Sequence, residues 1–200
     1  MLTLILETTL PDALIALYDD ASGQLWEQWD AQPRSSERLH AHLANLLATA
    51  HHTLLDVNRV VVTQGPGSFT GIRVGLAIAQ ALQMATQAKI VPLTTLQALA
   101  LSHPAEGPVT VLIDSLGQEV FTQTFANGQA VDAPQCLTVA ETEVYTADKT
   151  HLIGNGVAKL GKAAAPGQVN PHILATADLP AVTPTPLYLK PLNYRKVSGK

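Results

Sequence analysis

The chain has 200 residues, of which 46% are hydrophobic, and its formal net charge at pH 7 is −4. This composition supports one domain or two small lobes, and it excludes a basic surface for nucleic acid spread over the whole protein. Cys136 stands alone, so an intrachain disulfide is excluded and a reducing compartment is expected. No apolar run approaches the roughly 18 residues of a membrane span, and no signal-peptide pattern follows Met1, so we expect a cytoplasmic protein outside the membrane.

The N-terminal part predicts a three-stranded antiparallel meander followed by a helix. Apolar runs indicate strands over 2–6, 13–18 and 24–29. A serine at position 35 or 36 is expected to cap a helix that ends near His52. The apolar residues of this helix fall on one face, and they are Leu39, Leu43, Leu46, Leu47 and Ala50.

The stretch Val60–Ala88 combines a strand, a glycine turn and a long helix. Three valines begin the strand, and Gly65-Pro66-Gly67 cannot continue a regular element. Ser68 or Thr70 can cap the helix predicted over 71–88. A glycine turn before a helix is an anion-binding arrangement in general. The spacing here, however, matches neither the P-loop nor the G-x-G-x-x-G pattern.

Small residues spaced by four give the helix over 71–88 two narrow faces that another backbone can approach closely. The first face consists of Gly71, Gly75 and Ala79, and the second of Ala77, Ala81 and Ala85. Each interior glycine costs about 1 kcal/mol relative to alanine, which indicates that something packs tightly there. Periodicity leaves two alternatives open, namely the protein's own sheet or a partner protein.

After this helix, Lys89–Val91 predicts a strand and a capped helix follows to Leu101. Prolines and glycine within 102–108 mark a boundary. We therefore predict a βββαβαβα lobe over 1–102 and a short, strand-rich lobe over 103–200. The strands expected in the second lobe cover 109–113, 119–125 and 151–153. The chain ends in a basic tail, which either contacts an anionic partner or is simply solvated, with Lys190, Arg195, Lys196 and Lys200.

Common catalytic patterns are missed. No histidine pair has the spacing of a zinc site, so no metal is expected. Ser68 lies one place too early for the G-x-S-x-G elbow, and Cys136 is expected to be a packed thiol. Glu7 and Asp114 each follow a buried strand, where a carboxylate could hold a hydrated cation or activate water. Polar residues are also common at strand ends without any such role.

The stretch QGPGSFTGIRVGLAIAQAL, preceded by VVV, resembles the signature of the TsaB (YeaZ) family of bacterial tRNA threonylcarbamoyladenosine-modification proteins. Further stretches that resemble the family are LTLILETT, SERL, VLIDSLGQEVF and PTPLYLK. The resemblance implies an α/β protein with the two-lobed actin/Hsp70-like ATPase (ASKHA) fold, in which the C-terminal lobe is small and degenerate. It also implies a non-catalytic scaffold subunit that supports a larger paralogue, TsaD, which transfers a threonylcarbamoyl group to the adenosine beside the tRNA anticodon.

Further partners follow from the same resemblance. A TsaE-type ATPase joins the complex, tRNA is contacted indirectly, and the chain alone forms a homodimer. The chain needs no cofactor of its own, and ATP or ADP with Mg²⁺ is expected only at an interface of the complex.

Three sets of residues carry these expectations. The partner interface is expected on the two long helices at Leu39, Leu43, Leu46, Leu47, Gly71, Gly75, Ile78, Ala79 and Leu82. The signature loop comprises Gly65, Pro66, Gly67, Ser68, Phe69, Thr70, Gly71 and Arg73. A vestigial nucleotide cleft is expected at Glu7, Thr8, Thr9, Asp114, Gly154 and Gly156.

The chain departs from the family pattern around this cleft. Glu7-Thr8-Thr9 replaces the usual Asp-Thr-Ser or Asp-Thr-Ala, and Leu10-Pro11 stands where the superfamily's phosphate turn has glycine. Asp114-Ser115-Leu116 replaces Asp-Ala-Arg, and Lys190 replaces an arginine. These departures count against an ATP site and leave the helices unaffected. The alternative function is a small ATPase or phosphotransferase that uses Glu7, Asp114 and the turn at 154–156.

Overall fold

The computed structural model describes residues 1–32, 35–163 and 165–190, and its first half forms a five-stranded sheet with the order β3-β2-β1-β4-β5. The β1, β2 and β3 strands form an antiparallel meander, while β4 pairs parallel with β1 and β5 parallel with β4. The strands are β1 (Leu2–Glu7), β2 (Ala13–Asp19), β3 (Gln24–Asp30), β4 (Val57–Thr63) and β5 (Lys89–Leu93). The predicted meander with parallel additions is confirmed.

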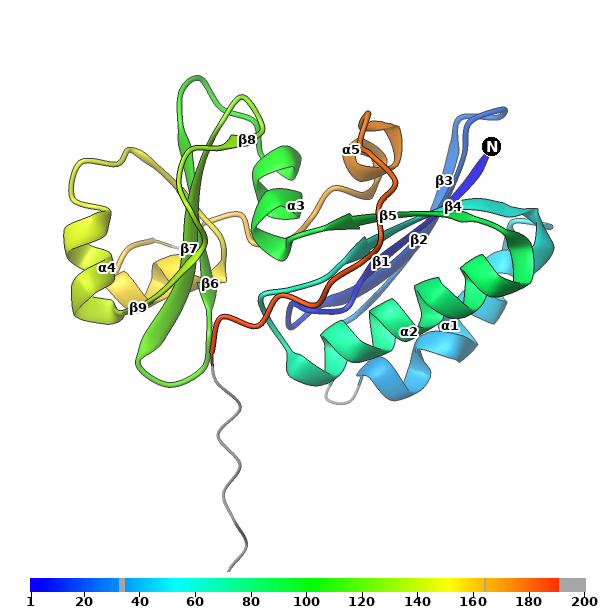
Figure 1. Cartoon of the computed structure of the whole chain (residues 1–200), viewed down its shortest axis with the longest axis horizontal. Coiled ribbons are helices and arrows are strands. Elements are labelled where there is room, and N and C mark those ends of the chain that lie inside the picture. Colours follow the sequence, from blue (N-terminus) through cyan, green and yellow to red (C-terminus); the bar gives the residue numbers. More distant parts are fainter. Residues whose placement is uncertain (33–34, 164, 191–200) are drawn as a thin grey trace, which may run out of the picture.

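Helices cover both faces of this sheet (Figure 1). They are α1 (Ser35–Thr49) and α2 (Phe69–Thr86) on one face, and α3 (Thr95–Ser102) and α5 (Pro171–Thr176) on the other. Side chains of β1 alternate between the faces, so Leu4 and Leu6 pack with α1 and α2, while Ile5 packs with α3 and α5. We call this sheet with its four helices the first lobe.

A second mixed sheet follows α3 and has the order β10-β6-β7-β8, with β9 also paired to β7. Its strands are β6 (Val109–Asp114), β7 (Glu119–Ala126), β8 (Gln129–Ala130), β9 (Gln135–Thr138) and β10 (His151–Ile153). Its helices are α4 (Val139–Tyr145) and the short 3-10 helix η2 (Asn155–Leu160). Together they form the second lobe. A further 3-10 helix, η1 (Leu54–Asp56), precedes β4.

One hydrophobic cluster runs through both lobes. It joins Ile5, Val61 and Leu96 of the first lobe to Val111 and Phe121 of the second. The α5 helix follows the second lobe in sequence yet packs on α3, β1 and β2. The division of the chain at residue 102 stays a prediction, because the C-terminal half forms the second lobe and also contributes α5 to the first lobe.

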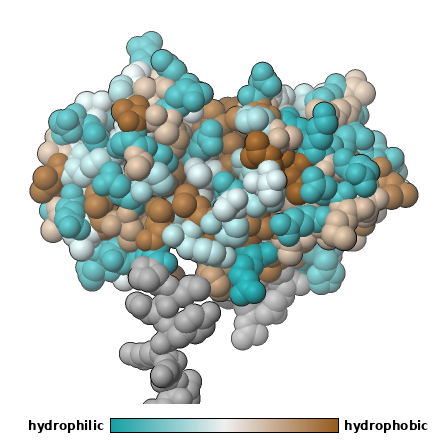
Figure 2. Space-filling view, viewed as in Figure 1, coloured by the Kyte–Doolittle hydropathy of each residue, from teal (hydrophilic) through white to brown (hydrophobic). Residues whose placement is uncertain are grey.

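The surface of the described residues is mixed in character. Brown hydrophobic and teal hydrophilic residues are interspersed over the face shown in Figure 2. Within the described residues, no helix is both long enough and apolar enough to cross a membrane. The basic tail beyond Lys190 lies outside the described residues.

Candidate functional site

The signature loop is a packing junction between three segments of the chain. Of the two predicted caps of α2, Ser68 takes this position, because its hydroxyl accepts a hydrogen bond from the Gly71 amide at 3.2 Å. The Ser68 amide in turn donates to the Thr9 carbonyl at 2.8 Å, which fixes the loop to the end of β1. A side chain at Gly67 would place its Cβ 2.4 Å from the same carbonyl, so the close approach requires glycine.

The first small-residue face of α2 packs on the protein's own β1 turn. A Cβ at Gly71 would lie 1.7 Å from the Thr8 carbonyl oxygen, and one at Gly75 would lie 2.5 Å from the Thr8 hydroxyl oxygen. The Thr8 hydroxyl donates to the Gly71 carbonyl at 2.7 Å. Of the two alternatives left open by the sequence, the structure therefore assigns this face to the protein's own core.

Most of the residues expected at the partner interface are buried inside the first lobe, and this expectation is corrected. They fill the space between α1, α2 and the sheet, where apolar side chains are removed from water. These are Leu39, Leu43, Leu46, Leu47, Gly71, Gly75, Ala79 and Leu82. Ile78 is half-buried at the edge of the same cluster.

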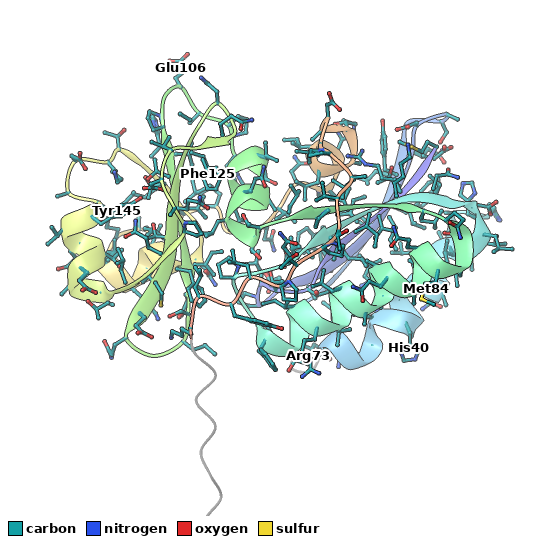
Figure 3. The ribbon with its side chains drawn as sticks, viewed as in Figure 1. His40, Arg73, Met84, Glu106, Phe125 and Tyr145 are labelled. Carbon is teal, nitrogen blue, oxygen red and sulfur yellow. The ribbon has the colours of Figure 1, made fainter. Side chains whose placement is uncertain are left out.

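A different set of α1 and α2 residues faces away from the sheet. Their side chains are small or apolar, and all are exposed: Ala41, Ala44, Ala48, Ala77, Ala81, Met84 and Ala85. We call this set the alanine face. Met84 is 83% exposed, and Figure 3 shows it with Arg73 and His40 on the outer side of the helical layer. Met84 is the large apolar side chain of this set, and the others are alanines.

Glu7 is fully buried and turns back onto its own strand end. Its Oε1 atom accepts hydrogen bonds from the Thr9 amide, the Thr9 hydroxyl and the Leu10 amide at 2.5, 2.7 and 2.9 Å. Burial raises the pKa of the Glu7 carboxyl above its usual value, against the opposing effect of these donors. The nucleotide-cleft prediction would require a carboxyl that a hydrated cation can reach from the solvent. The Glu7 carboxyl is instead fully buried.

Thr8 and Thr9 are also occupied by internal contacts. The Thr9 hydroxyl lies 2.6 Å from the Thr95 hydroxyl, next to the start of α3. Thr8 is engaged by α2, as described above. The hydroxyls of Thr8 and Thr9 thus join the end of β1 to α2 and α3, while Glu7 Oε2 is buried and has no hydrogen-bond partner among the described residues. The nucleotide cleft stays a prediction.

Asp114, Gly154 and Gly156 lie close together in the second lobe, whereas Glu7, the first residue of the predicted cleft, belongs to β1 of the first lobe. The Asp114 amide donates to the Asn155 side chain at 2.9 Å, and Lys159 pairs with the Asp114 carboxylate at 2.5 Å. A Cβ at Gly154 would lie 2.1 Å from the Leu112 carbonyl, so this glycine also serves close backbone packing. Among the described residues, no group of three His, Cys, Asp or Glu side chains could hold a metal ion.

This fold and this junction define a class of protein: two α/β lobes, with a glycine signature that packs β1 against a long helix. Residues 29–187 match the family model described as "TsaD: tRNA N6-adenosine threonylcarbamoyltransferase". The match covers more than half of the chain, which therefore belongs to this family. The α/β class expected from the sequence is confirmed by the two sheets and their helices, and the resemblance to the TsaB (YeaZ) proteins is confirmed as well.

The curated relatives match about half of this chain. "tRNA threonylcarbamoyladenosine biosynthesis protein TsaB" of Escherichia coli (strain K12) is 31% identical over 101 residues, which are 50% of this chain and 43% of that protein. The protein of the same name from Haemophilus influenzae is 32% identical over 97 residues, which are 46% of this chain and 41% of that protein. The chain thus spans less than half the length of these relatives.

Solved structures support the fold. The structure described as "YeaZ from Pseudomonas aeruginosa" is 21% identical, with a TM-score of 0.70, and the match covers 88% of this chain and 89% of that one. A second structure from the same organism, described as an uncharacterized protein "with similarity to peptidase YEAZ", has a TM-score of 0.74 at 22% identity and covers 94% and 99%.

Proposed function

We propose that this protein is an accessory subunit in the biosynthesis of threonylcarbamoyladenosine in tRNA, and that it acts by binding a TsaD-type paralogue. The names of the curated relatives support the pathway. The observation that carries the mode of action is the alanine face on α1 and α2. Small side chains on two neighbouring helices let another helical pair approach closely, and Met84 offers a flexible apolar contact.

The proposed interface therefore lies on the same two helices that the sequence indicated, α1 and α2. It uses their outer, exposed face and not the face that packs on the sheet. In the absence of the paralogue, the same face would pair two copies of the chain, since a two-fold dimer uses one surface twice. A TsaE-type ATPase and tRNA would join through the assembled complex. The internal use of Glu7, Thr8 and Thr9 supports a scaffold over the alternative of a small ATPase or phosphotransferase.

The test is co-purification with the TsaD-type paralogue of the same organism. Ala81→Glu places a carboxylate in the middle of the alanine face, and we expect it to weaken binding at least about tenfold, because an unpaired charge would be desolvated at the interface. Val144→Glu is the matched control, since Val144 is 79% exposed on α4 of the second lobe.

Both variants should keep the melting temperature of the parent, because exposed substitutions usually change stability by less than about 0.5 kcal/mol. A folded Ala81→Glu protein that still binds the paralogue with parental affinity would contradict the proposed interface. Variants of buried positions such as Gly75 or Leu43 would be uninformative, since they disturb the core itself.

A further inference from the structure

The segment that follows α5 links the two lobes. It runs in an extended conformation past β5 and ends at Lys190 against the second lobe (Figure 1). The sequence marks it only as proline-rich and as resembling a family stretch. Its contacts give it a specific place, at the start of α2.

On the first lobe, Gln64 receives this segment through two backbone donors. The Leu187 amide donates to the Gln64 carbonyl at 2.8 Å, and the Thr185 amide donates to the Gln64 side-chain oxygen at 3.0 Å. A Cβ at Gly65 would lie 2.5 Å from the Leu187 carbonyl, so the first glycine of the signature loop leaves room for this segment. The Tyr188 ring packs 5.1 Å from that of Phe69, the first residue of α2.

On the second lobe, Lys190 binds the turn between β6 and β7. Its ammonium group donates to the carbonyls of Ser115 and Leu116 at 3.0 and 3.2 Å, and it pairs with the Glu119 carboxylate at 2.5 Å. Leu189 packs beside it against the cluster that runs through both lobes. Lys190 thus satisfies two carbonyl groups and one carboxylate with a single cation.

The turn that Lys190 binds is itself an unusual piece of backbone. Leu116 has a φ of 60°, in the left-handed region, and its side chain is 81% exposed. Lys159 holds the same turn from within the second lobe, donating to the Gly117 and Glu119 carbonyls at 3.0 and 2.9 Å. Two lysines therefore donate hydrogen bonds to the same turn. Lys159 belongs to the second lobe, whereas Lys190 belongs to the segment that crosses from the first lobe.

We propose that Thr185–Lys190 is a clasp, a segment that fixes the start of α2 to the β6–β7 turn. The contacts of Lys190 with this turn keep the whole segment docked. Pro184 and Pro186 restrict the backbone to extended conformations, which lowers the entropy lost when the segment docks. When Lys190 dissociates from the β6–β7 turn, the segment also loses its contacts with Gln64 and Phe69. The two lobes are then no longer connected by this segment on the side of the signature loop.

Hydrogen exchange of the full chain, measured amide by amide, tests this proposal without any partner protein. In Lys190→Met, we expect the Thr185 and Leu187 amides to exchange at least about tenfold faster than in the parent, because their bonds to Gln64 are no longer held. The Ser68 amide, which is bonded to Thr9 in the same loop, should stay within about twofold of the parent.

Lys159→Met is the matched control, because it removes the other lysine from the same turn without touching the segment. It should leave the Thr185 and Leu187 amides unchanged. Tyr188→Ala combined with Lys190→Met removes the ring contact with Phe69 and the lysine contacts with the β6–β7 turn together. The clasp is refuted if the two amides keep the parental rate in this double variant, or if Lys159→Met releases them as much as Lys190→Met does.

Discussion

Thr8 decides which residue type α2 can carry at two positions. At Gly71 the obstacle to a side chain is the Thr8 backbone carbonyl, which cannot move without shifting β1. At Gly75 the obstacle is the Thr8 hydroxyl, which can rotate or be removed by mutation. The two glycines look alike in the sequence, but a side chain is excluded at each of them by a different kind of atom.

This difference predicts a double-mutant cycle on the free energy of unfolding. Gly71→Ala should destabilise by about 3 kcal/mol or more in any background, because the overlap is with backbone. Gly75→Ala should destabilise the parent but become neutral or stabilising by up to about 1 kcal/mol in a Thr8→Ala background, since alanine then contributes only its better helix propensity. Urea unfolding followed by tryptophan fluorescence measures all the variants.

Equal costs of Gly75→Ala in the two backgrounds would show that the Thr8 hydroxyl is not what excludes a side chain at Gly75. Gly71→Ala serves as the internal control, because its cost should not depend on the Thr8 side chain.

Glu7 predicts a particular dependence of stability on pH. Its pKa is raised in the folded state by burial, so the folded protein binds the proton more tightly than the unfolded chain does. The contribution to stability is thus complete below the unfolded value, near 4.5, and is lost as the pH rises through the folded pKa.

Glu7→Gln keeps an oxygen for the Thr9 and Leu10 donors but cannot ionise. Relative to the parent, the variant should gain unfolding free energy as the pH is raised from 4 to 8, in urea titrations at each pH. If the difference in unfolding free energy between parent and variant stays constant over this range, the pKa of Glu7 does not change on folding.

At the scale of elements, Asp30 connects the end of β3 to α1. Its carboxylate accepts from Arg38 Nε and Nη2 at 2.8 and 2.9 Å, and His42 Nε2 lies 3.0 Å away. The hydrogen bonds of Arg38 first, and then those of His42, hold the pKa of Asp30 well below its usual value. These contacts orient a helix whose outer side belongs to the alanine face.

Asp30→Asn should loosen α1, so that amides of this helix exchange faster while those of α3 keep their rates. The stabilisation from a lowered pKa is present above the unfolded value and is lost as the pH falls through the folded one, so the effect of the mutation should fade in acid. Asp19→Asn, at the last residue of β2, is the control, since the Asp19 carboxylate contacts Ala21, Ser22 and the chain's N-terminus, away from α1. Unchanged α1 exchange in Asp30→Asn would contradict the connection.

Two helices of the C-terminal half of the chain, α4 and α5, show no clear apolar periodicity but carry local start signals in the sequence. The α4 helix begins with a capping box, in which Thr138 and Glu141 satisfy each other's backbone amides. The α5 helix begins with Asn170 as cap and Pro171 in its first turn. Both helices are too short for an apolar stripe to stand out, so these start signals were the available means of finding them.

For the molecule as a whole, the shared core predicts a single unfolding transition. The cluster that runs through both lobes, and Arg59 of β4 donating to the Ala175 and Ala177 carbonyls at 2.6 and 2.9 Å, tie the C-terminal half to the first sheet. Trp26 and Trp29 both lie in β3, so tryptophan fluorescence reports the first lobe alone.

Fluorescence and far-ultraviolet circular dichroism should therefore give coincident transitions, and the calorimetric and van't Hoff enthalpies should agree. Two separated transitions would instead support independent units on either side of residue 102. Calorimetry of the full chain distinguishes these outcomes directly.

The sequence by itself determined the strands of the first lobe, its helices α1, α2 and α3, and the family, and it left the cap of α2 between Ser68 and Thr70, because these depend on local pattern and on one long signature stretch. It did not determine what the small residues of α2 pack against, since a 3.6-residue period is the same for a face on the core and a face on a partner. Only the tertiary structure, through the contact with Thr8, turned Gly71 and Gly75 inward and left Ala77, Ala81 and Met84 outside. The same holds for Gly65, whose neighbour Leu187 is distant in sequence and adjacent only in the folded chain.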